Sequence, residues 1–323
     1  MSLTIKQLKA QFTSIYADLP THWQRDWLLH IIDKPSGFLI SDDDHLLSDD
    51  EYTRWQVGMN KMQAGMPLAY LTGVQAFWGL DFAVNEHTLI PRPDTEVLVE
   101  QVLIWIEQQS QDAQHRWQTN QHQPLKLLDM GTGSGCVAIS LAFELNQRQR
   151  KKHQQYSASH PYFNSQSWQI FATDISPQAL TIAKKNSLSN LNDSKNLDNL
   201  TQTSITFLQS HWFNDLPIPQ HDDDKFMVIV SNPPYIDKAD SHLANLTAEP
   251  ITALVADKQG LADIESIIMG ARAYLHANGL LAIEHGYTQA KAVRSIFDTY
   301  GYHNVRTVQD YAGQDRVSLG ELE

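Results

Sequence analysis

The sequence predicts an α/β fold with a doubly wound, mostly parallel sheet, preceded by a small N-terminal helical domain. Strand-like apolar runs alternate with helical patterns from about residue 125 to the end of the chain, as in parallel sheets that are covered by helices. The first 65 or so residues show only helix-like spacing. With 323 residues, the chain is long enough for one full α/β domain and a smaller one.

The N-terminal part predicts three helices, over residues 3–19, 21–33 and 48–65, because apolar side chains recur there at near-helical spacing. Each segment opens with Ser or Thr followed three residues later by Gln or Glu, which is the pattern of a capping box. The three pairs are Thr4 with Gln7, Thr21 with Gln24, and Ser48 with Glu51. The aromatic residues of these helices are expected to build a small core.

An aromatic-rich stretch around Gly79, residues 75–84, predicts a β-hairpin. The turn Ile90-Pro91-Arg92-Pro93 follows, and Asp94 or Thr95 is expected to cap the next helix. These signals divide the chain into a helical domain over 1–74, a hairpin and linker over 75–93, and the main α/β domain over 94–323.

The main domain is predicted to contain seven strands, near residues 125–130, 168–173, 204–208, 226–231, 280–285, 303–309 and 316–321. Helices are predicted near 136–146, 177–188, 260–276 and 287–300. The helix over 260–276 has its apolar residues on one face, and Asn278-Gly279 follows it as a stop signal. Two stretches rich in Gln, Asn, Ser and Lys, 146–167 and 187–203, predict surface insertions.

The first strand of the main domain passes through Asp129 into Gly131-Thr132-Gly133-Ser134-Gly135, and a helical pattern follows. Such a loop can cradle a nucleotide-type ligand, because glycines let backbone N–H groups approach it and the helix N-terminus favours negative charge. A dinucleotide fingerprint would need glycine at Cys136, and a Walker loop would need Gly-Lys-Ser or Gly-Lys-Thr. The loop therefore resembles one that binds S-adenosylmethionine (SAM), with an ordinary strand-helix turn as the alternative.

The second strand ends at Asp174, and Ser176-Pro177 opens the helix that follows. An acidic residue at the end of the second strand can accept hydrogen bonds from both hydroxyls of a ribose. Asp174 could also serve only as a helix cap. Because Asp174 follows the glycine loop along the chain, ribose binding is the favoured role for it.

The tetrapeptide Asn232-Pro233-Pro234-Tyr235 directly follows the apolar strand 226–231, at the edge where α/β sheets hold ligands. Two prolines remove two backbone donors, so the Asn232 side-chain oxygen and the Pro233 carbonyl are the main acceptors here. Tyr235 adds a flat face. This corner suits a planar NH2 group, although a Pro pair after a strand can also simply end it.

Composition narrows the function classes. The formal net charge of −13 argues against a protein that neutralises a long stretch of phosphate backbone. A single cysteine excludes an intramolecular disulfide, no apolar run reaches the length of a membrane span, and residues 1–12 lack a signal-peptide pattern. No spacing of histidines and carboxylates suits a metal site. Together these features predict a cytoplasmic protein that binds no metal and no membrane and makes no extensive contact with nucleic acid.

Four motifs occur together along the chain: Leu89-Ile90-Pro91-Arg92-Pro93-Asp94-Thr95-Glu96, Asp129 to Gly135, Asn232-Pro233-Pro234-Tyr235-Ile236 and Glu284-His285-Gly286. In this order they resemble the PrmC/HemK family of peptide chain release factor glutamine methyltransferases. The resemblance runs from about Pro67 to the C-terminus, and the helical N-terminus is similar in kind. It implies a seven-stranded, Rossmann-like class I SAM-dependent methyltransferase domain behind a substrate-recognition domain.

The resemblance also implies an activity in translation termination. The methyl group of SAM would pass to the side-chain nitrogen N5 of the glutamine in a Gly-Gly-Gln motif of release factors, leaving S-adenosylhomocysteine. The residues implied in SAM binding are Gly131, Thr132, Gly133, Ser134 and Gly135 at the methionine part, Asp174 at the ribose, Trp212 by the adenine, and Asn232. Those implied in gripping the glutamine are Asn232, Pro233, Pro234 and Tyr235, with Asn232, Pro233 and Tyr235 aligning it for direct transfer.

The chain departs from this family at His211, where an acidic residue is usual. A neutral histidine nitrogen or a backbone carbonyl is expected to accept the adenine amino group instead. The polar stretches 146–167 and 187–203 are longer than in the family. Of the two residues at the last motif, His285 is expected to support the loop, and Glu284 is left open between support and proton transfer.

Two other functions remain open from the sequence. An adenine-N6 methyltransferase of DNA or RNA would present the same donor geometry to the Asn-Pro-Pro-Tyr corner. The acidic charge and the lack of a large basic domain argue against it. A catalytically silent SAM-binding module is the other alternative, and the presence of both motifs argues against that.

Overall fold

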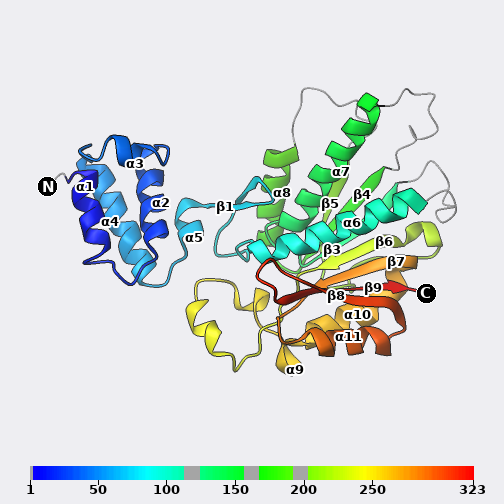
Figure 1. Ribbon diagram of the computed structural model, residues 1–323. Helices are drawn as coiled ribbons and strands as arrows, with labels where there is room; N and C mark the ends of the chain where they lie inside the picture. The colour runs from blue at the N-terminus through cyan, green and yellow to red at the C-terminus, as the bar shows by residue number, and fades with distance from the viewer. Residues whose placement is uncertain (1–2, 113–123, 156–166, 192–202) are drawn as a thin grey trace. The chain divides into compact units, whose positions relative to one another are not determined.

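A computed structural model describes residues 3–112, 124–155, 167–191 and 203–323. The chain forms two compact units (Figure 1). Unit 1 contains Met1–Val74 and the short later segment Ala244–Ala248, and unit 2 contains Gln75–Leu243 and Glu249–Glu323. No helix among the described residues is long and apolar enough to cross a membrane.

Unit 1 is helical, with α1 (Ile5–Phe12), α2 (Thr21–Ile32), α3 (Phe38–Ser41), α4 (Asp49–Gln63) and α5 (Leu68–Thr72). Its aromatic side chains lie inside, as predicted. Trp55 is fully buried, with the ring of Phe12 stacked at 6.2 Å and that of Tyr16 edge-on at 5.6 Å. The Trp27 indole donates a hydrogen bond to the Trp55 carbonyl at 3.0 Å. These contacts give the small unit its core.

Two of the three predicted capping boxes are confirmed, at Thr4 and at Ser48, where both reciprocal hydrogen bonds are present. The prediction of a capping box at Thr21 is wrong. Pro20 is the N-cap of α2, and the Gln24 side chain instead donates to the carbonyls of Tyr16 and Leu19 at 2.9 Å each. Because Gln24 is buried, it joins α2 to the preceding segment and does not reach back to the helix start.

The predicted hairpin is confirmed as β1 (Val74–Phe77) and β2 (Leu80–Ala83). Its turn holds Trp78 and Gly79 with φ of 53° and 69°, which is the left-handed pair of a tight hairpin turn. The helix after the proline turn, α6 (Glu96–Asp112), follows a 3-10 turn at Pro93–Thr95. Asp94 and Thr95 bond to residues far along the chain, as described below.

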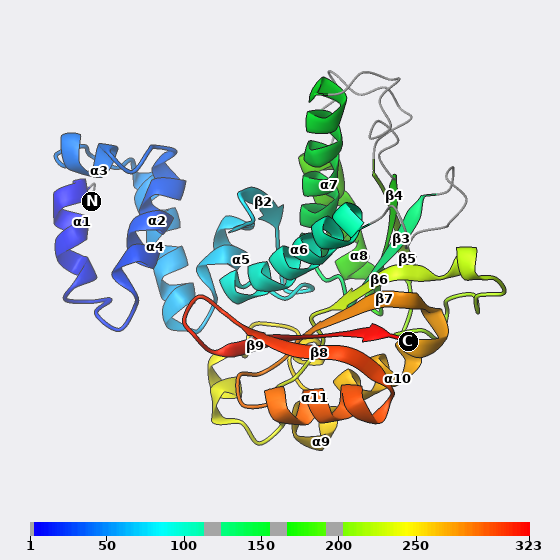
Figure 2. The same cartoon turned by 45° about the vertical axis from the view of Figure 1, so that its right-hand side comes forward.

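The seven strands of unit 2 form one sheet, which Figure 2 shows in a second view. They are β3 (Leu125–Met130), β4 (Trp168–Asp174), β5 (Ser204–Gln209), β6 (Phe226–Ser231), β7 (Leu275–Glu284), β8 (Tyr302–Gln309) and β9 (Asp315–Leu322). Their order is β5-β4-β3-β6-β7-β9-β8, and of these seven strands only β9 runs in the opposite direction to the others. The predicted doubly wound sheet is confirmed.

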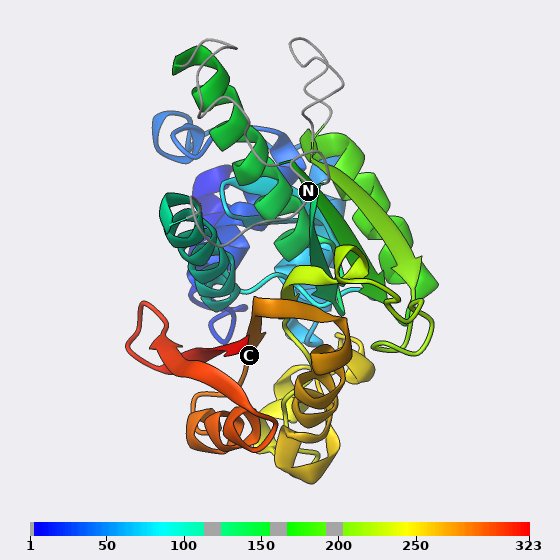
Figure 3. The same cartoon turned by 90° about the vertical axis from the view of Figure 1, so that its right-hand side faces the viewer.

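Successive residues of the central strands face opposite sides of this sheet. Leu127 lies in the core beneath α6 and α7 (Cys136–Gln155), whereas Leu128 lies in the core beneath α10 (Ala262–Tyr274) and α11 (Ala290–Thr299). Figure 3 shows the two helical layers on either side of the strands. Strands buried on both faces read as continuous apolar runs, which is why their positions could be predicted.

The strand order reverses between β3 and β6, which pair directly with Met130 opposite Ser231. The glycine loop after Met130 and the Asn-Pro-Pro-Tyr corner after Ser231 therefore leave the sheet side by side. Open α/β sheets bind ligands in the crevice at such a switch point. The topology thus brings the two predicted motifs together.

Some predicted boundaries are wrong. Residues 146–155 continue α7 and residues 187–191 continue α8 (Pro177–Leu191), so these parts of the expected insertions are helical. The remaining 156–166 and 192–202 lie outside the described residues. The helix expected over 260–276 ends at Tyr274, because β7 already begins at Leu275 and carries Asn278 in a left-handed conformation.

Candidate methyl-transfer site

The glycine loop between β3 and α7 has a backbone that glycine favours. Gly131, Gly133 and Gly135 have φ of 72°, 55° and 85°, a region that side chains with a Cβ rarely adopt. A Cβ at Gly135 would lie 2.8 Å from Cδ1 of Ile139 and 3.1 Å from Cβ of Ala183. Gly135 is therefore needed both for the turn and for the packing of α7 against α8.

Asp129, at the end of β3, fastens this loop. Its Oδ2 accepts hydrogen bonds from the Thr132 hydroxyl at 2.7 Å and from the Ala138 backbone N–H at 3.2 Å. Burial raises the pKa of Asp129 to about 7, against the lowering effect of these two hydrogen bonds. Asp129 thus joins the loop to the first turn of α7.

Asp174 ends β4 and faces the same loop. Oδ2 accepts the Gly133 N–H and Oδ1 accepts the Ser176 N–H, each at 2.9 Å. The Ala179 N–H bonds to the Ser176 hydroxyl at 3.1 Å, so Ser176 caps α8 and the cap alternative for Asp174 is wrong. Each Asp174 oxygen keeps a second lone pair, which leaves acceptors for two hydroxyl groups. Burial raises the pKa of this carboxyl.

A cavity of about 310 Å³ lies over the loop, within the size range of small-molecule sites. Six predicted site residues line it: Gly131, Gly133, Asp174, Trp212, Asn232 and Pro234. A smaller recess of about 40 Å³ adjoins it and is lined by Thr132, Ser134 and again Asn232. Gly135, Pro233 and Tyr235 line neither of these two cavities.

Trp212 forms one wall of the cavity. Its ring lies against Gly131, where a Cβ would be 3.6 Å from Cζ3, and its indole N–H donates to Oδ1 of Asp263 at 3.1 Å. Asp263 also lines the cavity, and burial raises its pKa. Asp263 was not predicted from the sequence, which pointed to His211 or a backbone carbonyl as the acceptor. His211 is exposed and also lines the cavity. A carboxylate therefore lies on this wall, from α10 instead of the loop after β5.

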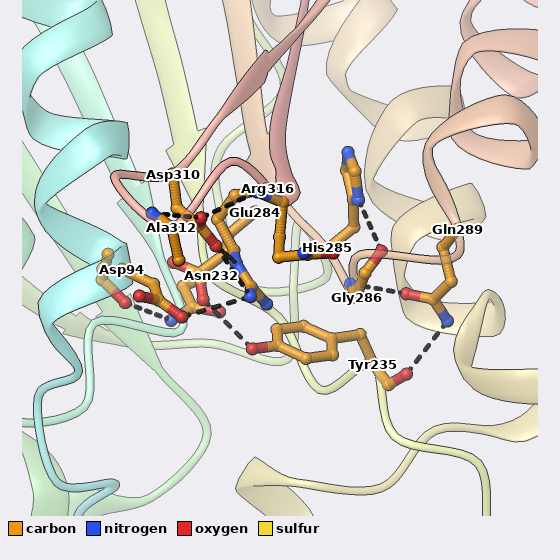
Figure 4. A network of polar contacts seen from close by, with 12 residues as sticks. Asp94, Asn232, Tyr235, Glu284, His285, Gly286, Gln289, Asp310, Ala312 and Arg316 are labelled. Carbon is orange, nitrogen blue, oxygen red and sulfur yellow. Dashed lines mark hydrogen bonds and ion pairs between the residues drawn. The ribbon is translucent and has the colours of Figure 1, made fainter.

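The Asn-Pro-Pro-Tyr corner is held at both ends (Figure 4). The Asn232 amide nitrogen donates to Oγ1 of Thr95 at 3.1 Å, and the Tyr235 hydroxyl donates to Oε1 of Glu284 at 3.1 Å. The side-chain nitrogen of Gln289 donates to the Tyr235 carbonyl at 3.0 Å. Gly260 packs so closely that a Cβ there would lie 2.0 Å from the Tyr235 carbonyl oxygen.

Glu284 is buried beneath the corner, and burial raises its pKa to about 7. Arg316 and the Thr95 and Tyr235 hydroxyls act in the opposite direction, since they favour the charged carboxylate. Arg316 itself forms ion pairs with Asp94 at 3.1 Å and Asp310 at 3.0 Å. Asp94 and Thr95 therefore belong to this network, and their sequence signal was read as a helix cap.

His285 is fully buried, and desolvation lowers its pKa. Nδ1 contacts the Gly286 carbonyl at 2.9 Å and Nε2 contacts the Ser318 hydroxyl at 2.8 Å. A carbonyl can only accept, so Nδ1 carries the proton and Nε2 accepts from Ser318. With both nitrogens engaged, the ring supports the loop after β7, in line with the expectation.

Cys136 begins α7 beneath the loop, and burial raises the pKa of its thiol to about 12. A thiol in this state is a packing group and not a nucleophile. Among the described residues, no three His, Cys, Asp or Glu side chains are grouped so that they could hold a metal ion. Asp174, Asp263, Asn232, His211 and Thr252 are among the polar residues that line the cavity.

A doubly wound sheet with this loop, this acidic strand end and this corner at its switch point defines a class I methyltransferase that uses SAM. The positive-φ glycines, the spare acceptors of Asp174 and the cavity volume all fit that cofactor. A family model described as the PrmC N-terminal domain matches residues 4–73, and one described as Eco57I restriction-modification methylase matches residues 168–258.

Proteins named release factor glutamine methyltransferase are similar over most of the chain. Those of Aliivibrio fischeri and Escherichia coli K12 are each 36% identical, covering 91% of this chain and 87% and 89% of theirs. The one from Vibrio cholerae is 36% identical and covers 100% of this chain and 98% of its own. The chain belongs to the release factor glutamine methyltransferase family.

Among solved structures, a methyltransferase from Pyrococcus furiosus is 17% identical with a TM-score of 0.42, covering 85% of this chain and 98% of that chain. A likeness of this degree adds nothing on the substrate.

Proposed function

We propose that this protein transfers a methyl group from SAM to N5 of the glutamine in the Gly-Gly-Gln motif of peptide chain release factors. Relatives that cover 91% and 100% of the chain are named release factor glutamine methyltransferase. The observation that carries the proposal is the position of Asn232, which lines both the cavity over the glycine loop and the recess beside it. One side chain can therefore face the cofactor and the acceptor amide together.

The chemistry requires alignment more than activation. An amide nitrogen is a weak nucleophile because its lone pair is delocalised, so both of its N–H bonds must be held while the nitrogen faces the methyl group. The Asn232 oxygen and the Pro233 carbonyl accept these two bonds, and Tyr235 packs against the amide plane. Positioning can lower a barrier by roughly 7–11 kcal/mol, whereas one neutral hydrogen bond contributes about 0.5–1.5 kcal/mol. Geometry is therefore the main catalytic term.

The cofactor site is assigned to the surfaces around the cavity. Gly131 to Gly135 hold the methionine part, Asp174 takes the ribose hydroxyls, and Trp212 with Asp263 lies beside the adenine. SAM supplies an electrophilic methyl group on its sulfonium and leaves as S-adenosylhomocysteine. Asn232, in the Asn-Pro-Pro-Tyr corner, is assigned a further contact with SAM.

The release factor is proposed to be recognised by the helical domain over 1–74, with 75–93 as hairpin and linker and 94–323 as the methyltransferase domain. The match of residues 4–73 to the PrmC N-terminal domain supports this division. A substrate of the translation machinery supports a cytoplasmic protein, and the net charge of −13 supports little nucleic-acid binding.

The test is methyl transfer from labelled SAM to three acceptors: a release factor, the same factor with its Gly-Gly-Gln glutamine changed to alanine, and duplex DNA. A single methyl group on that glutamine, absent from the other two acceptors, is the expected result. Mass mapping of the labelled peptide locates the group. Label on the alanine variant at the same level would overturn the proposal.

One observation favours a second candidate, adenine-N6 methylation of nucleic acid. The match to the Eco57I restriction-modification methylase covers residues 168–258, which include the Asn-Pro-Pro-Tyr corner. Label on DNA and none on the factor would select this activity. The net charge favours the protein substrate.

A further inference from the structure

The side-chain amide of Asn232 has two possible orientations, and only one of them suits the proposed reaction. If its oxygen faces the cavity, it accepts an N–H of the substrate glutamine; if its NH2 group faces the cavity, two donors oppose each other. The two ends of an amide have nearly the same shape, so packing alone cannot choose between them. The choice depends on the hydrogen bond at the other end.

That hydrogen bond goes to Thr95. The Asn232 amide nitrogen lies 3.1 Å from the Thr95 hydroxyl oxygen, and Thr95 is 1% exposed. A hydroxyl can donate or accept, so Thr95 by itself would bind either end of the amide. Something further along must fix the direction in which the hydroxyl hydrogen points.

Glu284 is the group on the far side of Thr95. Its Oε1 accepts the Tyr235 hydroxyl at 3.1 Å, while Oε2 is buried without a partner at full hydrogen-bond distance among the described residues. The Thr95 hydroxyl nevertheless lies close enough to Glu284 to lower its pKa. A carboxylate accepts only, so a charged Glu284 draws the hydroxyl hydrogen of Thr95 towards itself.

The charge of Glu284 therefore sets the direction of both hydrogen bonds, from Thr95 to Glu284 and from Asn232 to Thr95. With Glu284 charged, Thr95 donates to the carboxylate and can only accept from Asn232, which turns the NH2 group to Thr95 and the oxygen to the substrate. With Glu284 protonated, the carboxyl can donate to Thr95, and Thr95 can then donate to the Asn232 oxygen. The amide would reverse and present its NH2 group to the substrate.

We propose that Thr95 and Glu284 are positioning residues that hold the Asn232 amide with its oxygen towards the substrate glutamine, Glu284 setting the direction and Thr95 passing it on. The proposal rests on the proposed function, because the orientation matters only if an NH2 group is the acceptor. Tyr235 takes part at the other carboxylate oxygen, so the two side chains of the corner share one anchor.

The variant Thr95→Val tests the link to Asn232, because valine keeps the shape of threonine and lacks the hydroxyl. We expect kcat on a release factor to fall about 30-fold while the Kd for SAM stays within about twofold, since a misdirected amide affects alignment and not cofactor binding. Thr95→Ser restores a hydroxyl and is expected to return kcat to within about threefold of the wild type.

Thr203→Val is the matched control. The Thr203 hydroxyl is buried without a hydrogen-bond partner in the described part of the chain. The residue precedes the start of β5, whereas the cavity is lined by residues that follow the end of that strand. It undergoes the same change from hydroxyl to methyl, and kcat is expected to remain within about twofold of the wild type.

The pH dependence of kcat tests Glu284. The groups that face it are Tyr235, the Thr95 hydroxyl, Asp94, Arg316 and the neutral Cys136. We expect kcat to fall as the pH drops through about 7, as the carboxylate gains a proton. Thr95→Val should remove this limb, because without the Thr95 hydroxyl the charge of Glu284 no longer sets the direction of the Asn232 amide. Glu284→Gln should abolish the limb.

Asp129 also titrates near pH 7, but Thr95 is not among the groups that shift it. A limb that stays in place in Thr95→Val and in Glu284→Gln therefore belongs elsewhere and overturns the role of Glu284. Wild-type kcat in Thr95→Val, or a joint loss of SAM affinity and kcat that serine does not restore, overturns the role of Thr95. In both cases the proposed function stands, whereas a wild-type protein that forms no methylglutamine overturns both proposals.

Discussion

The glycine loop and the Asn-Pro-Pro-Tyr corner lie side by side, yet they are held in different ways. The loop is fastened in part by a neighbour in sequence, since Asp129 binds Thr132 three residues later. Asp174 and Asn186, which bind Gly133 and Ser134, add ties from 41 and 52 residues away. The corner is fastened by partners 137, 49 and 54 residues away: Thr95, Glu284 and Gln289. The loop therefore has one tie within its own segment, whereas these three ties of the corner all need the assembled sheet. Mutations can therefore damage the corner alone.

The largest effect is expected from Asn232→Ala, which separates turnover from cofactor binding. Loss of the side-chain acceptor should lower kcat by about a thousandfold, because both alignment and one hydrogen bond to the amide are lost. The Kd for SAM should remain within about threefold, since the glycine loop and Asp174 are intact. Single-turnover transfer and calorimetric SAM titration measure the two quantities.

Asn190→Ala is the control for that change. Asn190 lies near the C-terminal end of α8, where its side chain donates to the carbonyls of Asp81 and Asn186. It should leave kcat within about twofold of the wild type. An Asn232→Ala protein that turns over as fast as this control would contradict the role of Asn232.

Gly260→Ala should disturb the corner from outside the motif. A Cβ there would lie 2.0 Å from the Tyr235 carbonyl oxygen and 2.7 Å from the Gln289 nitrogen that binds it. We expect kcat to fall by about a hundredfold, because a 1 Å displacement of an aligning group has an effect of that size. SAM affinity should change far less.

Gly301→Ala is matched to this variant. Gly301 has φ of 76°, close to the 80° of Gly260, but nothing lies within 4 Å of an added Cβ. Both alanines carry a similar backbone strain of about 1 kcal/mol, so only the contact with Tyr235 differs. Equal losses of kcat in the two variants would show that strain alone is responsible.

Burial of a carboxyl group has a stability consequence at the corner, as it does at Asp129 of the loop. Burial holds the pKa of Glu284 at about 7, above its ordinary 4.5. The folded state therefore binds more protons than the unfolded state between these values, so this group lowers stability as the pH rises through that window. Above pH 7 the loss is complete, and below about 4.5 it is absent.

Glu284→Gln removes this dependence. Relative to the wild type, the variant should gain on the order of 2 kcal/mol of unfolding free energy between pH 4.5 and 8, after a loss of about 1 kcal/mol for a weakened hydrogen bond. Urea unfolding of both proteins at several pH values measures the difference. Asp129 titrates in the same range but is present in both, so it cancels. A difference independent of pH would mean that Glu284 is not buried in its charged form.

The sequence predicted the fold and the loop because their signals are local. Strand β6 is an unbroken apolar run, and Gly131 and Gly133 occupy left-handed positions that only glycine fits well. The switch point followed from the alternation of strands and helices. By contrast, Thr21 carried a capping pattern that the fold did not use, because Gln24 found partners inside unit 1.

The supports of the corner could not be predicted, because each depends on a contact across the fold. Thr95 was read as a helix cap, and Gln289 and Asp263 carry no pattern of their own. Thr95 reaches Asn232 only when α6 packs beside the end of β6, and Gln289 reaches Tyr235 only through the start of α11. Side-chain bonds of this kind are set by tertiary packing, not by spacing along the chain.

The smallest expected effect is that of changing Asp263, which lies on the cavity wall beside Trp212 and is expected to act on SAM binding. Asp263 binds the Trp212 indole at 3.1 Å and keeps its other oxygen for a ligand. Asp263→Ala should raise the Kd for SAM about tenfold, the loss of one hydrogen bond to a charged group, and leave kcat at saturating SAM within about twofold. Asp263→Asn retains an acceptor for the indole and should raise Kd by less. If both variants lower kcat and spare Kd, Asp263 serves the corner instead, and the two halves of the site are coupled through α10.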